Sequence, residues 1–283
     1  MNIGHTESRV EELSNTLAGI LRAGSMSRKE AERLRGRLQW FESFSGGRVA
    51  QQALMTLSRM ASAGRRGEDL SKTEIDALNF LNTRVLNAPP TRIQSTSLQT
   101  WYVFSDGACE GEISKEGSVG AVLVSPCGVT CEFFAEVVPQ VWMQEFLQTS
   151  NHPIFELELL PVWIALSEWE GHLKHSQCVF YLDNEAAKGA LVRGATDAGI
   201  GAVLVSAFVV SELQCQVKVW FSRVPTSSNV ADGPSRMSFE DLLAKGVWRR
   251  RIDWDLLLTK LRKGGSETFG VSKRDPGLVP TAE

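Results

Sequence analysis

Apolar side chains recur at helical spacing through the first third of the chain. Over residues 7–86 this period predicts several helices, with a break near Gly24. Ser71 followed three residues later by Glu74 has the spacing of a capping box, which marks the start of the last of these helices. Asparagine and two prolines then end the pattern, so we expect a linker over residues 87–97.

After this linker the pattern becomes typical of strands. Residues 101–104, 119–124 and 129–138 are rich in β-branched and aromatic side chains. Turn residues stand between them, at Asp106-Gly107 and at Pro126-Cys127-Gly128. We therefore expect three strands in an antiparallel meander, with Asp106 closing the first strand.

Helices and strands alternate in the rest of the chain. The pattern predicts helices over 156–173, 184–193 and 199–213, and strands over 178–182 and 217–224. Residues 138–153 have the character of an insertion, which we expect to form an amphipathic cover for the sheet. Five strands with helices between the later ones indicate an α/β fold with a mixed sheet.

Charge is unevenly distributed along the 283 residues. The net charge is −3, but residues 1–95 carry +4, residues 96–238 carry −9 and residues 239–283 carry +2. A composition of 43% hydrophobic and 22% charged residues excludes wholesale disorder. The strand-rich part is therefore acidic, and its two flanks are mildly basic. The polar tail from Gly264 is expected to be disordered.

Cysteine and targeting signals point to an intracellular protein. The five cysteines are scattered without a CxxC pair, which favours reduced thiols in the cytoplasm or nucleus. The longest apolar run, residues 199–210, is short of the ~20 residues that span a bilayer. The N-terminus lacks the layout of a signal peptide, so we expect neither secretion nor membrane insertion.

Four carboxylates lie where a predicted strand ends or a helix begins: Asp106, Glu158, Asp183 and Asp232. Carboxylates at the ends of adjacent strands can converge on one edge of a sheet and hold Mg2+, which prefers oxygen ligands. Acidic residues at such positions also serve as turn formers or helix caps. For any single one of the four, both interpretations stay open.

The contexts of these carboxylates resemble the ribonuclease H domain of retroelement reverse transcriptases. The matching pieces are Ser105-Asp106-Gly107-Ala108, Glu158-Leu159-Leu160, Leu182-Asp183-Asn184 and, most specifically, Asn229-Val230-Ala231-Asp232 with the following Ser235-Arg236. The resemblance implies a ribonuclease H-like five-stranded mixed sheet flanked by helices and preceded by a small helical region. Residues 96–238 would form this domain, and residues 239–283 a basic helix and the tail.

A second resemblance lies upstream. Residues 33–41, followed by Gly47-Arg48, resemble the helical stretch after the polymerase palm of DIRS-like retroelements. Residues 1–95 would then be a thumb- or connection-like region. The chain has no Tyr-x-Asp-Asp motif, so we do not expect DNA synthesis by this chain alone. A separate palm-bearing reverse transcriptase chain is a candidate partner.

The resemblance implies a metal-dependent activity. Asp106, Glu158, Asp183 and Asp232 would bind two Mg2+ ions, with Mn2+ as an alternative, and hydrolyse the RNA strand of RNA–DNA hybrids. Glu156 is a competing carboxylate two residues before Glu158. The Leu-Leu and Ala-Leu sequence that follows favours Glu158, because the two acids lie ~200° apart on a helix.

Expected nucleic-acid contacts are Ser105, Asn184, Arg236, Arg249, Arg250 and Arg251. One departure from the family pattern is Arg223, which stands where many members have a histidine. This substitution keeps an alternative open: an inactive remnant of the fold that binds nucleic acid or a polymerase partner.

Overall fold

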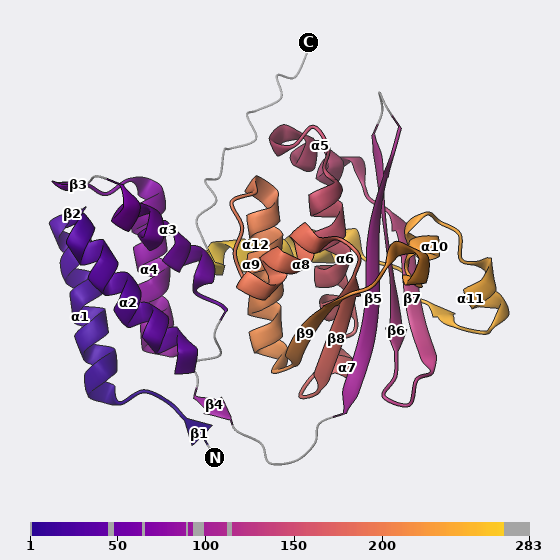
Figure 1. Cartoon of the computed structure of the whole chain (residues 1–283), viewed down its shortest axis with the longest axis horizontal. Helices are drawn as coiled ribbons and strands as arrows, with labels where there is room; N and C mark the ends of the chain where they lie inside the picture. The colour runs from indigo at the N-terminus through magenta and orange to yellow at the C-terminus, as the bar shows by residue number, and fades with distance from the viewer. Residues whose placement is uncertain are drawn as a thin grey trace, which may run out of the picture.

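The computed structural model describes residues 2–44, 48–63, 66–88, 90–92, 99–111 and 115–268. Figure 1 shows a bundle of helices from the N-terminal third beside a twisted sheet that carries helices on both faces. Each part has its own cluster of buried apolar side chains. The predicted division at residues 95 and 238 remains a prediction.

The helical region consists of four helices and two small strand pairs. The helices are α1 (Glu7–Ala23), α2 (Arg28–Phe44), α3 (Gln51–Ser62) and α4 (Lys72–Asn87). Strands β2 (Ser25–Ser27) and β3 (Arg66–Asp69) pair with each other, as do β1 (Asn2–Ile3) and β4 (Thr91–Arg92). The helical pattern is confirmed, and the two strand pairs were not predicted.

Local capping and one buried ion pair organise this region. The predicted capping box begins α4, because the Ser71 hydroxyl accepts from the Glu74 backbone N–H while the Glu74 carboxylate accepts from the Ser71 backbone. Between α4 and α2, Arg84 Nε donates to Glu42 Oε1 at 3.0 Å. Both side chains are buried, and burial raises the pKa of Glu42 while Arg84 opposes that rise.

The sheet has six strands in the order β10-β7-β6-β5-β8-β9. Their bounds are β5 Thr100–Glu110, β6 Glu116–Val124, β7 Thr130–Val137, β8 Gln177–Leu182, β9 Lys218–Arg223 and β10 Trp248–Arg249. Strands β5, β6 and β7 form the predicted antiparallel meander. Strand β8 pairs in parallel with β5, and β9 pairs in parallel with β8. The predicted α/β fold with a mixed sheet is confirmed, and β10 is an additional two-residue edge strand beside the five predicted strands.

Helices cover the two faces of the sheet unequally. The larger core lies under α5 (Gln140–Thr149), α6 (Ile154–Glu168), α7 (Glu170–Leu173), α8 (Glu185–Arg193), α9 (Gly199–Cys215) and α12 (Trp254–Thr268). The other face carries a smaller cluster that includes Val247, with the partly buried Phe239 packed against it, beside α10 (Asp232–Ser235) and α11 (Glu240–Ala244). Helix α5 buries Trp142, Met143 and Phe146, as expected of a cover over residues 138–153.

One local prediction was wrong. Asp106 does not close the first strand, and no turn forms at Asp106-Gly107, because β5 stays paired with β6 as far as Glu110. Its pairing with β8 ends earlier, at Phe104. Asp106 therefore lies inside a strand, just beyond the point where the parallel pair separates.

The C-terminal segment belongs with the sheet. Leu257 and Leu261 of α12 pack into the larger core, and α12 continues to Thr268. Most of the tail predicted to be disordered from Gly264 lies outside the described residues. Among the described residues, no helix combines the length and the apolar character needed to cross a membrane.

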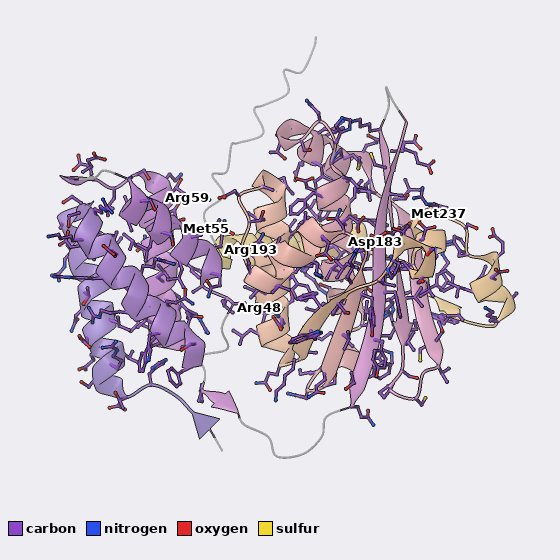
Figure 2. The ribbon with its side chains drawn as sticks, viewed as in Figure 1. Arg48, Met55, Arg59, Asp183, Arg193 and Met237 are labelled. Carbon is purple, nitrogen blue, oxygen red and sulfur yellow. The ribbon has the colours of Figure 1, made fainter. Side chains whose placement is uncertain are left out.

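The helical region packs against the end of α8 and against α9. Arg48 donates to the Leu191 carbonyl at 2.9 Å and pairs with Glu212. Gln52 exchanges two hydrogen bonds with the backbone of Thr196, both at 3.1 Å. Figure 2 shows Arg48, Met55 and Arg59 of the helical region gathered with Arg193 at this junction. The helical region is thus joined to the turn that follows the C-terminal end of α8. The N-terminal end of α8 adjoins Asp183.

Candidate metal centre

Three of the four predicted carboxylates meet where β5 and β8 separate. Asp106 comes from β5, Glu158 from α6 and Asp183 from the residue after β8. Each offers a carboxylate oxygen, and these oxygens all lie within 4.8 Å of one another. Asp106 is 4% exposed and Glu158 is 5% exposed. Glu158 of α6 therefore meets the two aspartates just beyond the last β5–β8 pair, Phe104 and Tyr181.

Burial and mutual repulsion raise the pKa values of the two buried acids. The pKa of Asp106 is raised to about 6, mainly by burial, with further contributions from Asp183 and Asp232 and opposition from the Ser235 hydroxyl. The pKa of Glu158 is raised to about 9, by burial and then by the charges of Asp106 and Asp183. With a pKa near 9, Glu158 keeps its proton at neutral pH without metal, and a bound cation would favour the ionised form of the cluster.

The donor set fits a hard divalent cation. Glu158 Oε2 is buried without a hydrogen-bond partner among the described residues, so one acceptor of the cluster has no compensation from the protein. All three candidate ligands are carboxylates, which suit Mg2+ or Mn2+ better than softer metals. These residues therefore match the metal that the sequence implies.

Asp232, the fourth predicted ligand, is outside this three-carboxylate cluster. Its Oδ1 accepts from Arg236 Nε at 3.1 Å, in an ion pair that joins the first residue of α10 to the residue after its end. It lies near enough to contribute to the raised pKa of Asp106. The structure thus brings three of the four acids together and leaves Asp232 adjacent, paired with Arg236.

The choice between the two α6 glutamates follows from their positions. Glu158 joins the cluster, whereas Glu156 does not, although Glu156 is also buried and burial raises its pKa. The two side chains leave the helix in different directions, as the angular argument from the sequence required. The geometry therefore favours Glu158 as the candidate ligand.

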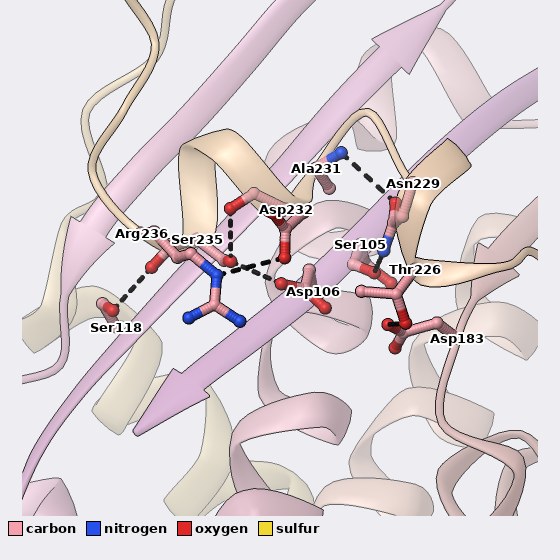
Figure 3. A network of polar contacts seen from close by, with 10 residues as sticks. All are labelled: Ser105, Asp106, Ser118, Asp183, Thr226, Asn229, Ala231, Asp232, Ser235 and Arg236. Carbon is pink, nitrogen blue, oxygen red and sulfur yellow. Dashed lines mark hydrogen bonds and ion pairs between the residues drawn. The ribbon is translucent and has the colours of Figure 1, made fainter. Parts of the chain in front are cut away.

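Polar side chains outside the cluster contact its members, as Figure 3 shows. Thr226 Oγ1 donates to Asp183 Oδ2 at 2.7 Å, and the Ser235 hydroxyl donates to Asp106 Oδ2. Asn229 donates to the backbone carbonyl of the residue before Asp106, at 3.1 Å. Sequence reasoning assigned no role to these three residues. The one available signal was their place in the segment that carries Asp232.

Two predicted nucleic-acid contacts, Ser105 and Asn184, directly adjoin acids of the cluster. Ser105 is fully buried, so its hydroxyl does not reach the surface. Asn184 is the N-cap of α8, and its Oδ1 accepts from the backbone N–H groups of Ala186 and Ala187, both at 3.0 Å. The cap fixes the first turn of the helix directly after Asp183.

The predicted arginines differ in how much of each guanidinium is free. Arg250 pairs with Glu132 at 2.8 Å and with Glu168 at 3.8 Å. Arg249 donates to the Ala135 carbonyl at 2.5 Å and lies over the ring of Phe239. Arg251 and Arg236 are exposed, each with one carboxylate partner.

Arg223, at the position where the family pattern has a histidine, is exposed near α8. Its Nε lies 3.5 Å from a carboxylate oxygen of Glu185, the first residue of that helix. A guanidinium stays protonated at neutral pH, so Arg223 cannot exchange a proton as an imidazole would.

No protein-family model and no curated protein matches the sequence. Among solved structures, the ribonuclease H1 of Halobacterium salinarum is 16% identical over 50% of this chain and 98% of its own, with a TM-score of 0.39. A ribonuclease H1 isolated from compost, solved with an RNA/DNA hybrid, is 12% identical over 50% of this chain and 99% of its own, at 0.38. The foamy viral protease–reverse transcriptase, also solved with a hybrid, is 11% identical over 65% of this chain and 27% of its own, at 0.35.

Proposed function

We propose that this chain is a metal-dependent endoribonuclease that hydrolyses the RNA strand of RNA–DNA hybrids. The observation that carries the proposal is the cluster of Asp106, Glu158 and Asp183, two of them buried, in which each residue offers a carboxylate oxygen and these oxygens lie within 4.8 Å of one another. A structural role alone would not require three acids to share one partly buried position, because their repulsion is unfavourable without a cation.

The metal would be held by the acids that the sequence singled out. Asp106, Glu158 and Asp183 would bind one divalent ion, Mg2+ or Mn2+, and Asp106 with Asp232 would bind a second. Such ions, when bound, supply activation of a water molecule and stabilisation of the leaving oxygen in phosphodiester hydrolysis. The chain's own contribution is to bring the carboxylates together and to keep their oxygens oriented.

The substrate class follows from the sequence resemblance and from the surrounding cations. Among the described residues, Arg236 pairs only with Asp232 and through its Nε, and Arg251 is exposed. Both can contact phosphates, which supply most of the affinity of a hybrid-binding surface. The proposal includes an origin in a retroelement reverse transcriptase and a separate palm-bearing partner chain.

A second candidate is a catalytically inactive module that binds nucleic acid or a polymerase. The ion pair between Asp232 and Arg236 favours it, since Arg236 already neutralises the fourth carboxylate. The two candidates differ in whether metal-dependent cleavage occurs.

Incubation of the full chain with a labelled RNA–DNA hybrid and Mg2+ separates them. Wild type is expected to cleave the RNA strand, and Asp106→Asn to lose cleavage while it stays folded. Glu156→Gln is the matched control, because Glu156 is a buried glutamate on the same helix outside the cluster. If folded wild type binds the hybrid without cutting it, the endoribonuclease proposal is wrong and the binding module stands.

A further inference from the structure

The segment from Thr226 to Arg236 crosses the end of the sheet at the candidate metal centre. It first contacts Asp183, beyond β8, through the Thr226 hydroxyl. It then contacts the backbone of Ser105 on β5 through Asn229, whose own Oδ1 accepts from the backbone N–H of Ala231. The Asn229 side chain is buried, so this part of the segment is attached to β5 beside Asp106.

The same segment is also attached to β6. Ser118 Oγ donates to the Ser235 carbonyl at 2.6 Å. Gly120 leaves the space that the segment needs, because a Cβ on Gly120 would lie 2.4 Å from the backbone nitrogen of Ser235. The position of Ser235 is therefore determined by backbone contacts with β6, independently of its own hydroxyl.

Two hydroxyls of this segment reach two carboxylates of the cluster. The Ser235 hydroxyl, fully buried, lies within hydrogen-bond distance of Asp106 Oδ2 and, at 2.8 Å, of the Asp232 carbonyl (Figure 3). Thr226 Oγ1 donates to Asp183 Oδ2 at 2.7 Å. Each bond engages one oxygen of its carboxylate and so restricts rotation of the carboxylate group. Glu158, the third member of the cluster, receives no such bond at its buried Oε2 from any residue that the structure describes.

We propose that Ser235 and Thr226 are positioning residues, one for each aspartate of the metal centre. Their hydrogen bonds hold Asp106 and Asp183 in the orientation that binds a divalent cation, before any cation arrives. The inference rests on the proposed function, because it presupposes that the cluster binds such an ion. Hydrogen bonds to ligating carboxylates are part of what determines metal affinity, and their loss costs about 10–100-fold.

The positioning role differs from simple packing in what a conservative change does. Thr226→Val keeps the shape of the side chain and removes the hydroxyl, whereas Thr226→Ser keeps the hydroxyl. A packing role predicts that valine is tolerated and serine is not, while a positioning role predicts the reverse. Thr226 is exposed, so neither change endangers the core.

The test is Mn2+ binding to the full chain without nucleic acid, followed through the electron paramagnetic resonance signal of free Mn2+. Ser235→Ala and Thr226→Val are each expected to weaken binding by about 10-fold or more, and Thr226→Ser to bind like wild type. Ser227→Ala is the matched control, because Ser227 is exposed on the same turn and bonds to no carboxylate among the described residues. Thermal unfolding of each variant tests whether it is folded. If Ser235→Ala does not fold, the two Thr226 variants decide.

The outcomes separate this inference from the proposed function. If Asp106→Asn loses Mn2+ while Ser235→Ala and Thr226→Val bind it like wild type, the metal centre stands and the positioning role is wrong. If wild type itself binds no more Mn2+ than Asp106→Asn, both are wrong. If Thr226→Val binds Mn2+ more weakly than wild type while Thr226→Ser binds it like wild type, the metal centre and the positioning role are both supported.

Discussion

The backbone of Gly107 on β5 lies directly against the carbonyl of Leu157 on α6. A Cβ placed on Gly107 would come within 2.3 Å of that oxygen and within 2.9 Å of the Glu158 nitrogen. Pro161 stands four residues after Leu157 and has no N–H to donate, so the Leu157 carbonyl lacks its usual helical partner. The glycine thus lets the helix that carries Glu158 approach the strand that carries Asp106.

Replacing Gly107 by alanine should disrupt both packing and metal binding. The obstructing atoms belong to the backbone of α6, so the helix must move for a methyl group to fit. We expect Gly107→Ala to lower the free energy of unfolding by about 1–3 kcal/mol and to weaken Mn2+ binding. Chemical denaturation and Mn2+ titration measure the two effects.

Gly36→Ala is the control for this substitution. Gly36 lies inside α2 with open space around its Cα, so alanine should raise stability by about 0.5–1 kcal/mol through helix propensity. Equal stability effects at the two glycines would contradict the close approach of α6 to β5.

The raised pKa of Glu158 makes metal-free stability depend on pH. Because the folded-state pKa is about 9 and the ordinary value is 4.5, the folded protein holds this proton more tightly than the unfolded chain. Stability should therefore fall as the pH rises from about 4.5 through 9. At pH 8 without metal, we expect Glu158→Gln to be more stable than wild type by on the order of 1–3 kcal/mol.

Added Mg2+ should make wild type more stable than Glu158→Gln at pH 8. Bound cation stabilises the ionised cluster, so the rise in melting temperature on adding Mg2+ should be larger at pH 8 than at pH 5.5 in wild type, and nearly absent in Glu158→Gln. Glu156→Gln should keep the wild-type response, because Glu156 lies outside the cluster. A Glu158→Gln variant that Mg2+ still stabilises fully would show that Glu158 is not a ligand.

Five strands of the sheet and the start of α4 could be predicted from the sequence because they rest on local patterns. Strand periodicity found the meander, and the Ser71–Glu74 pair found the start of α4. The Asp106-Gly107 pair led to the wrong prediction of a turn, because the same glycine that favours a turn also permits the close approach of a helix. That second use depends on α6, some fifty residues away in the chain, and leaves no local signal.

The sequence singled out the three clustered acids, together with Asp232, but not the residues that hydrogen-bond to them. The contexts of Asp106, Glu158 and Asp183 matched a family pattern, which does not need coordinates. The hydrogen bond from Ser235 to Asp106 joins residues 129 positions apart, and no spacing rule reports it. The paired state of Asp232 likewise depends on the rotamer of Arg236.

Arg236 should contribute to hybrid binding as a phosphate contact. It is 54% exposed as a side chain, and only its Nε is engaged by Asp232. Under the proposed function, we expect Arg236→Gln to weaken hybrid binding and to reduce the salt slope of log affinity by about one. Arg250→Gln is the comparison, since Arg250 pairs with two carboxylates and should leave the slope unchanged. An unchanged slope in Arg236→Gln would exclude a phosphate contact there.

Arg48 should be the main connection between the helical region and the sheet domain. Its guanidinium donates to the Leu191 carbonyl, pairs with Glu212 and lies 5.2 Å from the ring centre of Phe221. Without Arg48, the mostly buried Glu212 would lose the charge that opposes the rise in its pKa. We expect Arg48→Ala to lower the free energy of unfolding by about 1–3 kcal/mol at neutral pH, measured by chemical denaturation.

Two further variants test whether this loss comes from the junction. Arg59→Ala removes an exposed pair with Asp197 at the same junction and should cost less than about 1 kcal/mol, because solvent screens that pair. Glu212→Gln added to Arg48→Ala removes the uncompensated charge and should restore part of the stability. Limited proteolysis should cut between the helical region and the sheet domain faster in Arg48→Ala than in wild type. If Arg48→Ala and Arg59→Ala are equally mild, Arg48 is not what joins the two parts.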